Sequence, residues 1–308
     1  MTTALAPEPS KLANQRRKSN AKARGLGSRR GNVIAGIVAW IIGILFVFPV
    51  FFMVLTSLHS EPNASTNPPS FFAPLTLQGY KEFFGASSGA SPWPPLINSA
   101  IASIISTILV IVLAIPAAYA LSVRPIKKWT DAMFFFLSTK MLPAVAGLLP
   151  LYIFAKYLGL LDNINYLLIL YTAMNLPIAV WMMRSFLADI PVELFEAAAV
   201  DGAGLIRTLR SIIVPIISPG IAATALICFI FAWNELLLAN TLTSVVAGTA
   251  PVFLTSFVTS QGLFLAKVCA AATVVSLPVI IAGFAAQDKL VQGLSLGCLL
   301  YTSDAADE

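Results

Sequence analysis

The chain has 308 residues, of which 58% are hydrophobic and 11% are charged. A soluble domain usually carries about 25% charged residues, so the composition excludes an ordinary soluble protein and indicates an integral membrane protein. The net charge of +5 is concentrated near the N-terminus, where eight basic residues precede the first apolar segment. We interpret residues 1–32 as a disordered cytoplasmic tail that contacts anionic lipid headgroups. A nucleic-acid-binding tail is the alternative, but this tail contains no aromatic residue.

Residues 33–58 form the first predicted membrane span. No charged residue lies between Gly31 and Leu58, and this stretch exceeds the ~20 residues that a helix needs to cross the hydrocarbon core. The next segment, residues 59–95, is rich in proline, which favours turns and extended chain over one continuous helix. Its aromatic residues predict short helices at the outer membrane interface, where aromatic rings are favoured.

Periodic apolar segments predict six transmembrane helices in all, and their prolines predict kinks. The spans are residues 33–58, 96–123, 132–155, 166–187, 212–234 and 263–286. Lysine and arginine gather on the loops that share one side with the N-terminus, and such loops remain in the cytoplasm. These loops carry Arg124, Lys127, Lys128, Arg184, Arg207, Arg210 and Lys289, whereas the opposite loops carry Lys81 and Lys156. The asymmetry predicts that both termini are cytoplasmic.

The loop between the fourth and fifth spans, residues 188–211, has the most distinctive sequence of the chain. Asp189 and Pro191 are typical of a helix start, with an acceptor side chain at the cap and proline in the first turn. Val192 to Val200 is rich in alanine, the strongest helix former, and predicts a helix of about two turns. Gly202 permits a positive φ, which predicts a turn into a second short helix.

Two features of this predicted helix suit a contact with another protein. Leu194, Ala197 and Ala198 share a face at helical spacing, and small side chains there would let a partner's backbone approach closely. Glu196 and Asp201 offer negative charge to the same partner. The alternative is an ordinary amphipathic helix that lies on the membrane surface.

Polar residues within the spans are candidates for a transport pathway. Lys140 lies about eight residues into the third span, beside Ser138 and Thr139, and an ionisable residue at such depth is by default a functional-site hypothesis. The alternative is that the long lysine side chain snorkels to the inner headgroups. Asn175 in the fourth span would line the same cavity as Lys140.

The outer end of the fifth span carries a second polar group of residues. Trp233 precedes Asn234 and Glu235, and these two either face the substrate pathway or gate the exit from a binding protein. Glu235 equally suits the outer membrane boundary, with Trp233 in the aromatic belt, and we favour this boundary role.

The residues needed for catalysis or metal binding are scarce. His59 is the only histidine, and Cys228, Cys269 and Cys298 show no CxxC or other metal spacing. Neither a Walker A loop nor a dinucleotide fingerprint is present, so we expect no catalytic residue, no metal and no cofactor bound by this chain. An ion-gradient-driven secondary transporter is the alternative, but it would need acidic residues deep within the spans, which contain almost none.

The chain resembles the permeases of carbohydrate-uptake ABC importers, the group that includes the maltose-type inner-membrane subunits. The resemblance covers about residues 30–297 and is strongest in EAAAVDGAG (196–204), FAWNE (231–235) and QDKLVQGLSLG (287–297). Within that group, STKMLP (138–143), YTAMNLPIAVWMMRSFL (171–187) and SQGLFLAK (260–267) look most like permeases for polyols such as mannitol or sorbitol.

This resemblance implies an all-α fold of the type I importer permease, with six transmembrane helices and a cytoplasmic coupling helix. It implies a permease core over residues 96–286 and a cytoplasmic tail over residues 287–308, in the bacterial inner membrane. The implied partners are a second, non-identical permease, two ATP-binding subunits that hydrolyse ATP, and a soluble solute-binding protein. The implied ATPase-coupling residues are Glu196, Ala197, Ala198, Asp201 and Gly202. A mono- or disaccharide is the alternative to a polyol as substrate.

Overall fold

The computed structural model describes residues 29–66, 70–85, 91–123, 127–259 and 262–304. Side-chain environments are described within these ranges except at residues 29–32, 258–263 and 289–304. The predicted basic tail therefore lies outside the described residues up to position 28. The chain divides into two compact units, Met1–Leu55 and Thr56–Glu308.

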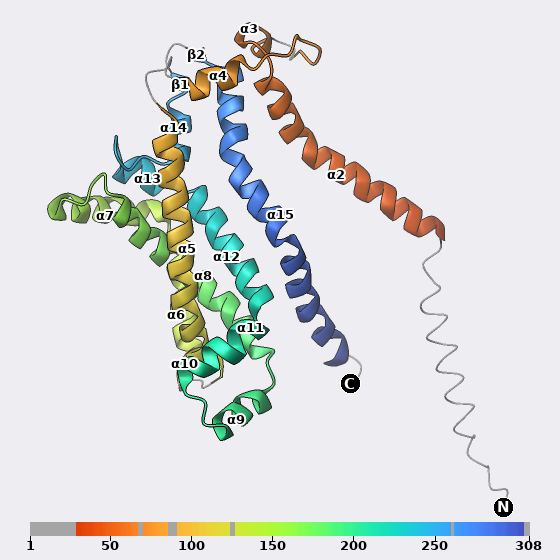
Figure 1. Cartoon of the computed structure of the whole chain (residues 1–308), viewed down its shortest axis with the longest axis vertical. Coiled ribbons are helices and arrows are strands. Elements are labelled where there is room, and N and C mark those ends of the chain that lie inside the picture. Colours follow the sequence, from red (N-terminus) through yellow and green to blue (C-terminus); the bar gives the residue numbers. More distant parts are fainter. Residues whose placement is uncertain (1–28, 67–69, 86–90, 124–126, 260–261, 305–308) are drawn as a thin grey trace, which may run out of the picture. The chain divides into compact units, whose positions relative to one another are not determined.

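The first unit is dominated by helix α2 (Arg29–Ser57) (Figure 1). This helix contains the predicted first span, begins before residue 33 and includes Pro49. Its apolar side chains are exposed around the whole circumference over residues 33–50. A helix that is apolar on every face suits a surrounding of lipid or of other membrane helices.

The second unit begins with short elements, as predicted for residues 59–95. Helices α3 (Glu61–Ala64) and α4 (Gln78–Phe84) lie beside the N-terminal part of the long helix α15 (Leu265–Asp304). Glu61 Oε1 accepts a hydrogen bond of 3.2 Å from the backbone N–H of Ala266, in the first turn of α15. A carboxylate at this position satisfies a donor that the helix itself leaves unpaired.

Helices α5 (Trp93–Ser122) and α8 (Ile164–Ala188) form the centre of this unit and pack extensively against each other. The buried face of α5 carries small side chains at helical spacing, which allows close approach of membrane helices. These residues are Ser99, Ala102, Ser103, Ser106, Val110, Ala114 and Ala118. Helix α12 (Ser218–Trp233) packs on both α5 and α8 and also contacts α15.

The third predicted span is not one continuous helix. Helix α6 (Trp129–Met141) and helix α7 (Ala144–Leu158) meet at an angle of 87°. Leu142 is extended, with ψ of 125°, because a residue before proline is disfavoured in the helical region, and Pro143 begins the new direction. The sequence indicated a kink at this proline, whereas the structure turns the chain nearly perpendicular.

The fifth predicted span, residues 212–234, is broken in the same way, and its bent pair begins earlier, within the predicted loop. The first helix of the pair consists of α10 (Leu205–Thr208), the π-helical segment η2 (Leu209–Ile213) and α11 (Val214–Ile216). This part meets α12 at 83°, where Ile217 leaves the helical conformation ahead of Ser218 and Pro219. Among the described residues, four long apolar helices and these two bent pairs together supply the six predicted spans.

Shorter elements connect α12 to α15. They are α13 (Leu237–Leu242), α14 (Ala250–Thr255) and a two-stranded antiparallel ribbon of β1 (Val258–Thr259) and β2 (Gly262–Leu263), in which Val258 pairs with Leu263. The sixth span thus begins at Leu265, and its helix continues to Asp304 through most of the predicted C-terminal tail.

Candidate coupling surface and polar pathway

Helix α9 (Val192–Val200) has the bounds that the sequence predicted, and it follows α8 after a short turn. Figure 1 shows it at the end of the second unit opposite to α4 and the β1–β2 ribbon. The predicted cap is wrong, because Pro191 occupies the N-cap position and Asp189 is instead the residue that ends α8. Proline has no side-chain acceptor, so α9 begins without a capping hydrogen bond from its N-cap residue.

One face of α9 packs against its own chain. Ala198 is buried, and the Phe195 ring lies edge-on to the Tyr119 ring of α5 with centroids 6.1 Å apart. Ala199 and Phe195 line a cavity of about 340 Å³ between α5, α9 and α10. The prediction that Ala198 shares an exposed face with Leu194 and Ala197 is therefore wrong, since only the latter two are exposed.

The exposed part of this loop carries the remaining predicted coupling residues. Glu196, Ala197, Asp201 and Gly202 are all exposed. Gly202 has φ of +69°, as predicted, and its N–H donates to Ala199 O at 3.1 Å. A positive φ at the residue that follows a helix reverses the chain direction and pairs its last carbonyls. The surface that α9 offers to a partner is thus acidic and rigidly terminated by a glycine turn.

Tyr119 holds α9 against α5, and Arg184 connects three membrane helices; sequence reasoning had given neither residue this role. Arg184 Nε donates to Leu121 O at 3.3 Å, and its guanidinium lies 3.9 Å from the centroid of the Trp129 ring. The side chain thereby connects α8 to the end of α5 and the start of α6. One signal in the sequence could have predicted the contact of α9 with Tyr119. Phe195 is an aromatic residue within the alanine-rich helix, and its spacing to Ala198 and Ala199 is that of an inward-facing side.

The predicted pathway residues Ser138, Thr139 and Lys140 lie in the last turns of α6, immediately before the 87° bend. Ser138 Oγ donates to Phe135 O at 2.8 Å, and Thr139 Oγ1 donates to Phe136 O at 2.7 Å. Both hydroxyl hydrogens are therefore used within α6, while their oxygens still have lone pairs for an incoming donor. Lys140 is exposed in the isolated chain.

Asn175 on α8 reaches α12. It is fully buried, and its Nδ2 donates to Cys228 O at 3.4 Å. Its Oδ1 has no hydrogen-bond partner among the described residues, which is costly for a buried amide oxygen. Asn175 thereby joins α8 to Cys228 of α12.

Asn234 and Glu235 belong to a separate group at the end of α12. Asn234 Nδ2 donates to Ile230 O within its own helix at 2.9 Å. The Glu235 carboxylate accepts hydrogen bonds from Leu238 N at 2.8 Å and Ala239 N at 3.1 Å, so it caps α13. It also accepts a hydrogen bond from the Tyr171 hydroxyl. Tyr171 and Asn175 are one turn apart on α8. The bond from Tyr171 to Glu235 and the bond from Asn175 to Cys228 therefore connect neighbouring turns of α8 to α12 and α13.

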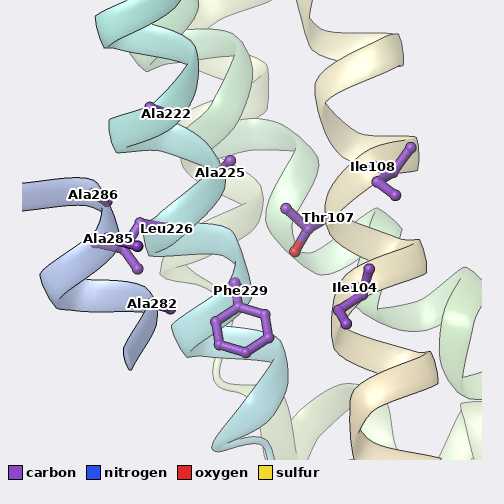
Figure 2. A pocket seen from close by; sticks show the side chains of 10 residues that line it. All are labelled: Ile104, Thr107, Ile108, Ala222, Ala225, Leu226, Phe229, Ala282, Ala285 and Ala286. Atoms are coloured by element: carbon purple, nitrogen blue, oxygen red, sulfur yellow. The ribbon is translucent and has the colours of Figure 1, made fainter. Parts of the chain in front are cut away.

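A larger cavity lies elsewhere and has a different character. It measures about 370 Å³ and lies between α5, α12 and α15, lined by alanines, isoleucines, Leu226 and Phe229 (Figure 2). Thr107 is the one polar residue that lines it. A ligand rich in hydroxyl groups needs donors and acceptors on the wall, so this cavity does not suit a sugar.

The chain matches known transport proteins over most of its length. The sequence profile of the family described as "Binding-protein-dependent transport system inner membrane component" matches residues 110–296. The chain is 37% identical to a probable ABC transporter permease protein of Sinorhizobium fredii, over 83% of this chain and 91% of that protein. It is 30% identical to a trehalose transport system permease protein of Mycobacterium tuberculosis, over 89% and 99% of the two chains.

A solved structure confirms the fold. A chain of a bacterial ABC transporter involved in the import of the acidic polysaccharide alginate superposes with a TM-score of 0.69 and 22% sequence identity, over 85% of this chain and 98% of that chain. The helical architecture and the membrane spans are therefore those of a type I permease fold. On the match to its profile and its relatives, the chain belongs to the family of binding-protein-dependent transport system inner membrane components, the permease subunits of ABC transporters.

Proposed function

We propose that this chain forms half of the translocation pathway of an ATP-driven importer and that its substrate is a linear polyol of the mannitol or sorbitol type. Its partners in this proposal are a second, non-identical permease, two ATP-binding subunits and a soluble solute-binding protein. ATP is hydrolysed by the ATP-binding subunits. The family match and the permease relatives support the part of this proposal that makes the chain a permease subunit of an ABC transporter.

The coupling part of the proposal assigns α9 and its glycine turn to the ATP-binding subunits. Glu196, Asp201 and Gly202 are exposed, whereas Phe195 and Ala198 hold the helix against α5. A force applied to the exposed face is transmitted to α5 by the Phe195–Tyr119 ring contact. Reporter fusions test the side: a fusion after Asp201 is expected to be cytoplasmic, and one after Ser91 is expected to be outside. Reversal at either position contradicts the proposed orientation.

The observation that carries the substrate assignment is the polar group around the bend of the third span. Ser138 Oγ and Thr139 Oγ1 offer acceptor lone pairs, the Lys140 ammonium offers three donors, and Asn175 Oδ1 is an unpaired acceptor buried inside the chain. A polyol hydroxyl both donates and accepts, so a chain of hydroxyls satisfies such a mixed set. A polyol has no ring, which makes it depend on polar groups more than on flat stacking surfaces. The sequence stretches that resemble polyol permeases, residues 138–143 and 171–187, contain these same side chains.

A mono- or disaccharide is the second candidate substrate. The observation that favours it is the relative named as a trehalose permease, which aligns with 89% of this chain. The same hydrogen-bonding groups suit a disaccharide, whose rings would require additional stacking surface from aromatic side chains.

Competition for uptake distinguishes the two substrates. Cells that carry the complete importer take up labelled mannitol or sorbitol, and unlabelled polyols or trehalose are added as competitors. We expect polyols to compete and trehalose to have little effect. Competition by trehalose without competition by polyols would assign the disaccharide.

A matched pair of lysine variants tests the pathway. Lys140→Ala is expected to raise the apparent KM for uptake at unchanged abundance of the complex, because it removes three donors beside the bend. Lys156→Ala alters an exposed lysine of α7, away from this polar group, and is expected to leave uptake unchanged. Equal KM values for the Lys140→Ala variant and the unaltered importer would show that Lys140 reaches the headgroups and not the substrate.

A further inference from the structure

The side chain of Asp162, between α7 and α8, organises a distant loop. Its Oδ1 accepts hydrogen bonds from Ser244 N and Ala247 N, each at 2.8 Å. Its Oδ2 accepts from Val245 N at 3.1 Å and Val246 N at 3.0 Å. One carboxylate thus satisfies four consecutive backbone donors of a segment more than 80 residues away. We call residues 243–249 the clamped loop.

The backbone of Asp162 is itself adapted to this task. Its φ is +55°, which makes it the one non-glycine residue with positive φ among the described residues. Aspartate and asparagine tolerate this conformation better than most residues, but it still costs free energy relative to the ordinary regions. The N–H of Asp162 also donates to Leu242 O at 2.9 Å, just before the clamped loop. Asp162 is therefore hydrogen-bonded to the chain on both sides of Thr243.

The first turns of α5 hold the clamped loop from another direction. Asn98 Nδ2 donates to Val246 O at 2.8 Å and to Gly248 O at 3.0 Å. Ser99 Oγ accepts a hydrogen bond from Ala250 N at 2.8 Å, just after the loop. Residues 247–250 are buried as a result. The loop is therefore fixed by side chains from two separate parts of the fold.

This rigid loop exposes two adjacent apolar side chains. Val245 is 90% exposed and Val246 is 73% exposed, although their backbone N–H groups are paired with Asp162. The clamped loop connects α13 to α14, which Figure 1 shows away from α9 and toward the end that carries the β1–β2 ribbon. Covering two exposed valines with a partner removes apolar surface from water, which is favourable.

We propose that Asp162 is a positioning residue that holds the clamped loop in the shape that presents Val245 and Val246 to the soluble solute-binding protein of the importer. This inference rests on the proposed function, because it requires the end of the unit opposite α9 to lie outside the membrane. The family is binding-protein-dependent, which supplies a soluble partner on that side. A prebuilt loop docks without a further loss of conformational freedom, since its backbone donors are already paired.

Binding of the partner without substrate tests the proposal. The complete importer is reconstituted in nanodiscs, and the fluorescently labelled, substrate-free binding protein of the same importer is titrated against it. Asp162→Gly keeps the positive φ but removes the carboxylate, and it is expected to raise the Kd about tenfold. The double variant Val245→Ser/Val246→Ser keeps the clamp and removes the apolar contact, and it is expected to raise the Kd similarly. Basal ATPase activity is expected to remain unchanged in both.

A neighbouring variant separates positioning from general stability. Asn163 caps α8 through its Oδ1, which accepts from Asn165 N at 2.9 Å, and among the described residues no hydrogen bond joins its side chain to the clamped loop. Asn163→Ala is therefore expected to lower the melting temperature without changing the Kd. Equal weakening of binding by Asp162→Gly and Asn163→Ala would overturn the proposal, as would an unchanged Kd for the double valine variant.

A second readout distinguishes a protein partner from the bilayer. A fluorophore at position 245 is expected to be shielded from an aqueous quencher when the binding protein is added and not before. Quenching by a lipid-borne quencher in the absence of the binding protein would show that the valines insert into the membrane and would overturn the proposal. No substrate is used in these measurements, so an error in the polyol assignment does not affect them.

Discussion

The Tyr171 hydroxyl of α8 donates a hydrogen bond of 3.1 Å to Oε2 of Glu235, a residue 64 positions further along the chain. The same carboxylate accepts two backbone N–H groups at the start of α13. Glu235 therefore serves as a common acceptor for three donors from two helices. Removing Glu235 leaves all three donors without their partner, whereas removing the Tyr171 hydroxyl removes only one bond.

The first prediction follows from this difference. Glu235→Ala is expected to destabilise the folded permease by about 1–3 kcal/mol, because buried donors lose their acceptor. Tyr171→Phe is expected to cost about 0.5–1.5 kcal/mol, the usual net value of one hydrogen bond. Thermal unfolding of the purified complex in detergent measures both effects. A larger loss for Tyr171→Phe than for Glu235→Ala would contradict the capping role of Glu235.

The second prediction concerns the turn after α9. Gly202 has φ of +69°, and a Cβ built there meets no atom within 4 Å, so any penalty arises from the backbone and not from a clash. Gly202→Val is expected to uncouple ATP hydrolysis from uptake or to weaken assembly, because β-branched residues resist a positive φ. Gly202→Asn is expected to retain most activity, since asparagine tolerates this region.

Gly204 supplies the matched control for that series. Its φ is −68°, an ordinary value, and a Cβ there also meets nothing within 4 Å. Gly204→Val is therefore expected to transport normally. Uptake and ATPase activity are measured in the same proteoliposomes, and normal coupling in Gly202→Val would show that the positive φ is dispensable.

The third prediction concerns the packing of α8 on α12. A Cβ at Gly220 would lie 2.4 Å from Cδ2 of Phe186, which is far below van der Waals contact. Gly220→Ala is expected to destabilise the permease by about 1–3 kcal/mol through overpacking. In the Phe186→Ala background the same change is expected to cost much less, because the ring that it meets is gone.

Gly283 on α15 is the control for this substitution, since a Cβ there meets no atom within 4 Å. Gly283→Ala is expected to leave the melting temperature unchanged or to raise it slightly, because alanine favours a helix over glycine. If Gly220→Ala were equally harmless, the close approach of α12 to Phe186 would not be a constraint on packing.

The fourth prediction concerns pH. Partial burial acts to raise the pKa of Asp162, but its hydrogen bonds from Ala247, Val246, Ser244 and Val245 outweigh burial and hold the pKa below its ordinary value of 3.8. A carboxylate with a lowered folded pKa stabilises the fold fully above the unfolded pKa and loses this contribution as the pH falls through the folded pKa. The clamped loop is therefore expected to stay ordered at neutral pH and to loosen only below about pH 4.

A spin label at position 245 measures this order. Its spectrum is expected to remain immobilised as the pH falls from about 7 to about 4 and to become mobile under more acidic conditions. Asp162→Asn keeps one acceptor oxygen but cannot titrate, so its label is expected to show partial mobility that does not depend on pH in this range. Loosening of the unaltered loop near neutral pH would contradict the lowered pKa.

Local signals in the sequence were sufficient for much of the fold. The bounds of α9 followed from alanine content and proline, and the conformation of Gly202 followed from the need to reverse the chain. The bends of 87° and 83° did not follow, because a proline indicates where a helix breaks but the angle depends on the helices against which each half packs. Continuous hydropathy across residues 132–155 concealed the break.

The polar contacts were less predictable because they join residues distant in sequence. Lys140 and Asn175 were identified by their depth within spans, yet the hydrogen bond from Asn175 to Cys228 could be found only from the packing of α8 on α12. Asp162 escaped notice entirely, since an aspartate between two helices is typical of a solvated turn. Its four partners belong to a loop whose own sequence gives no indication of a carboxylate.

The π-helical segment η2 absorbs an extra residue inside the broken fifth span. Its bonding pattern accommodates more residues in one turn than an α-helix does. Each residue of an α-helix advances the chain by about 100° around the axis, from the 3.6 residues per turn. Deleting one residue between Leu209 and Ile213 would therefore restore α-helical spacing and leave α10 and α11 close to their present azimuths. A deletion within α10, which has no wide turn to shorten, would instead rotate the loop that carries Glu196 by about 100°.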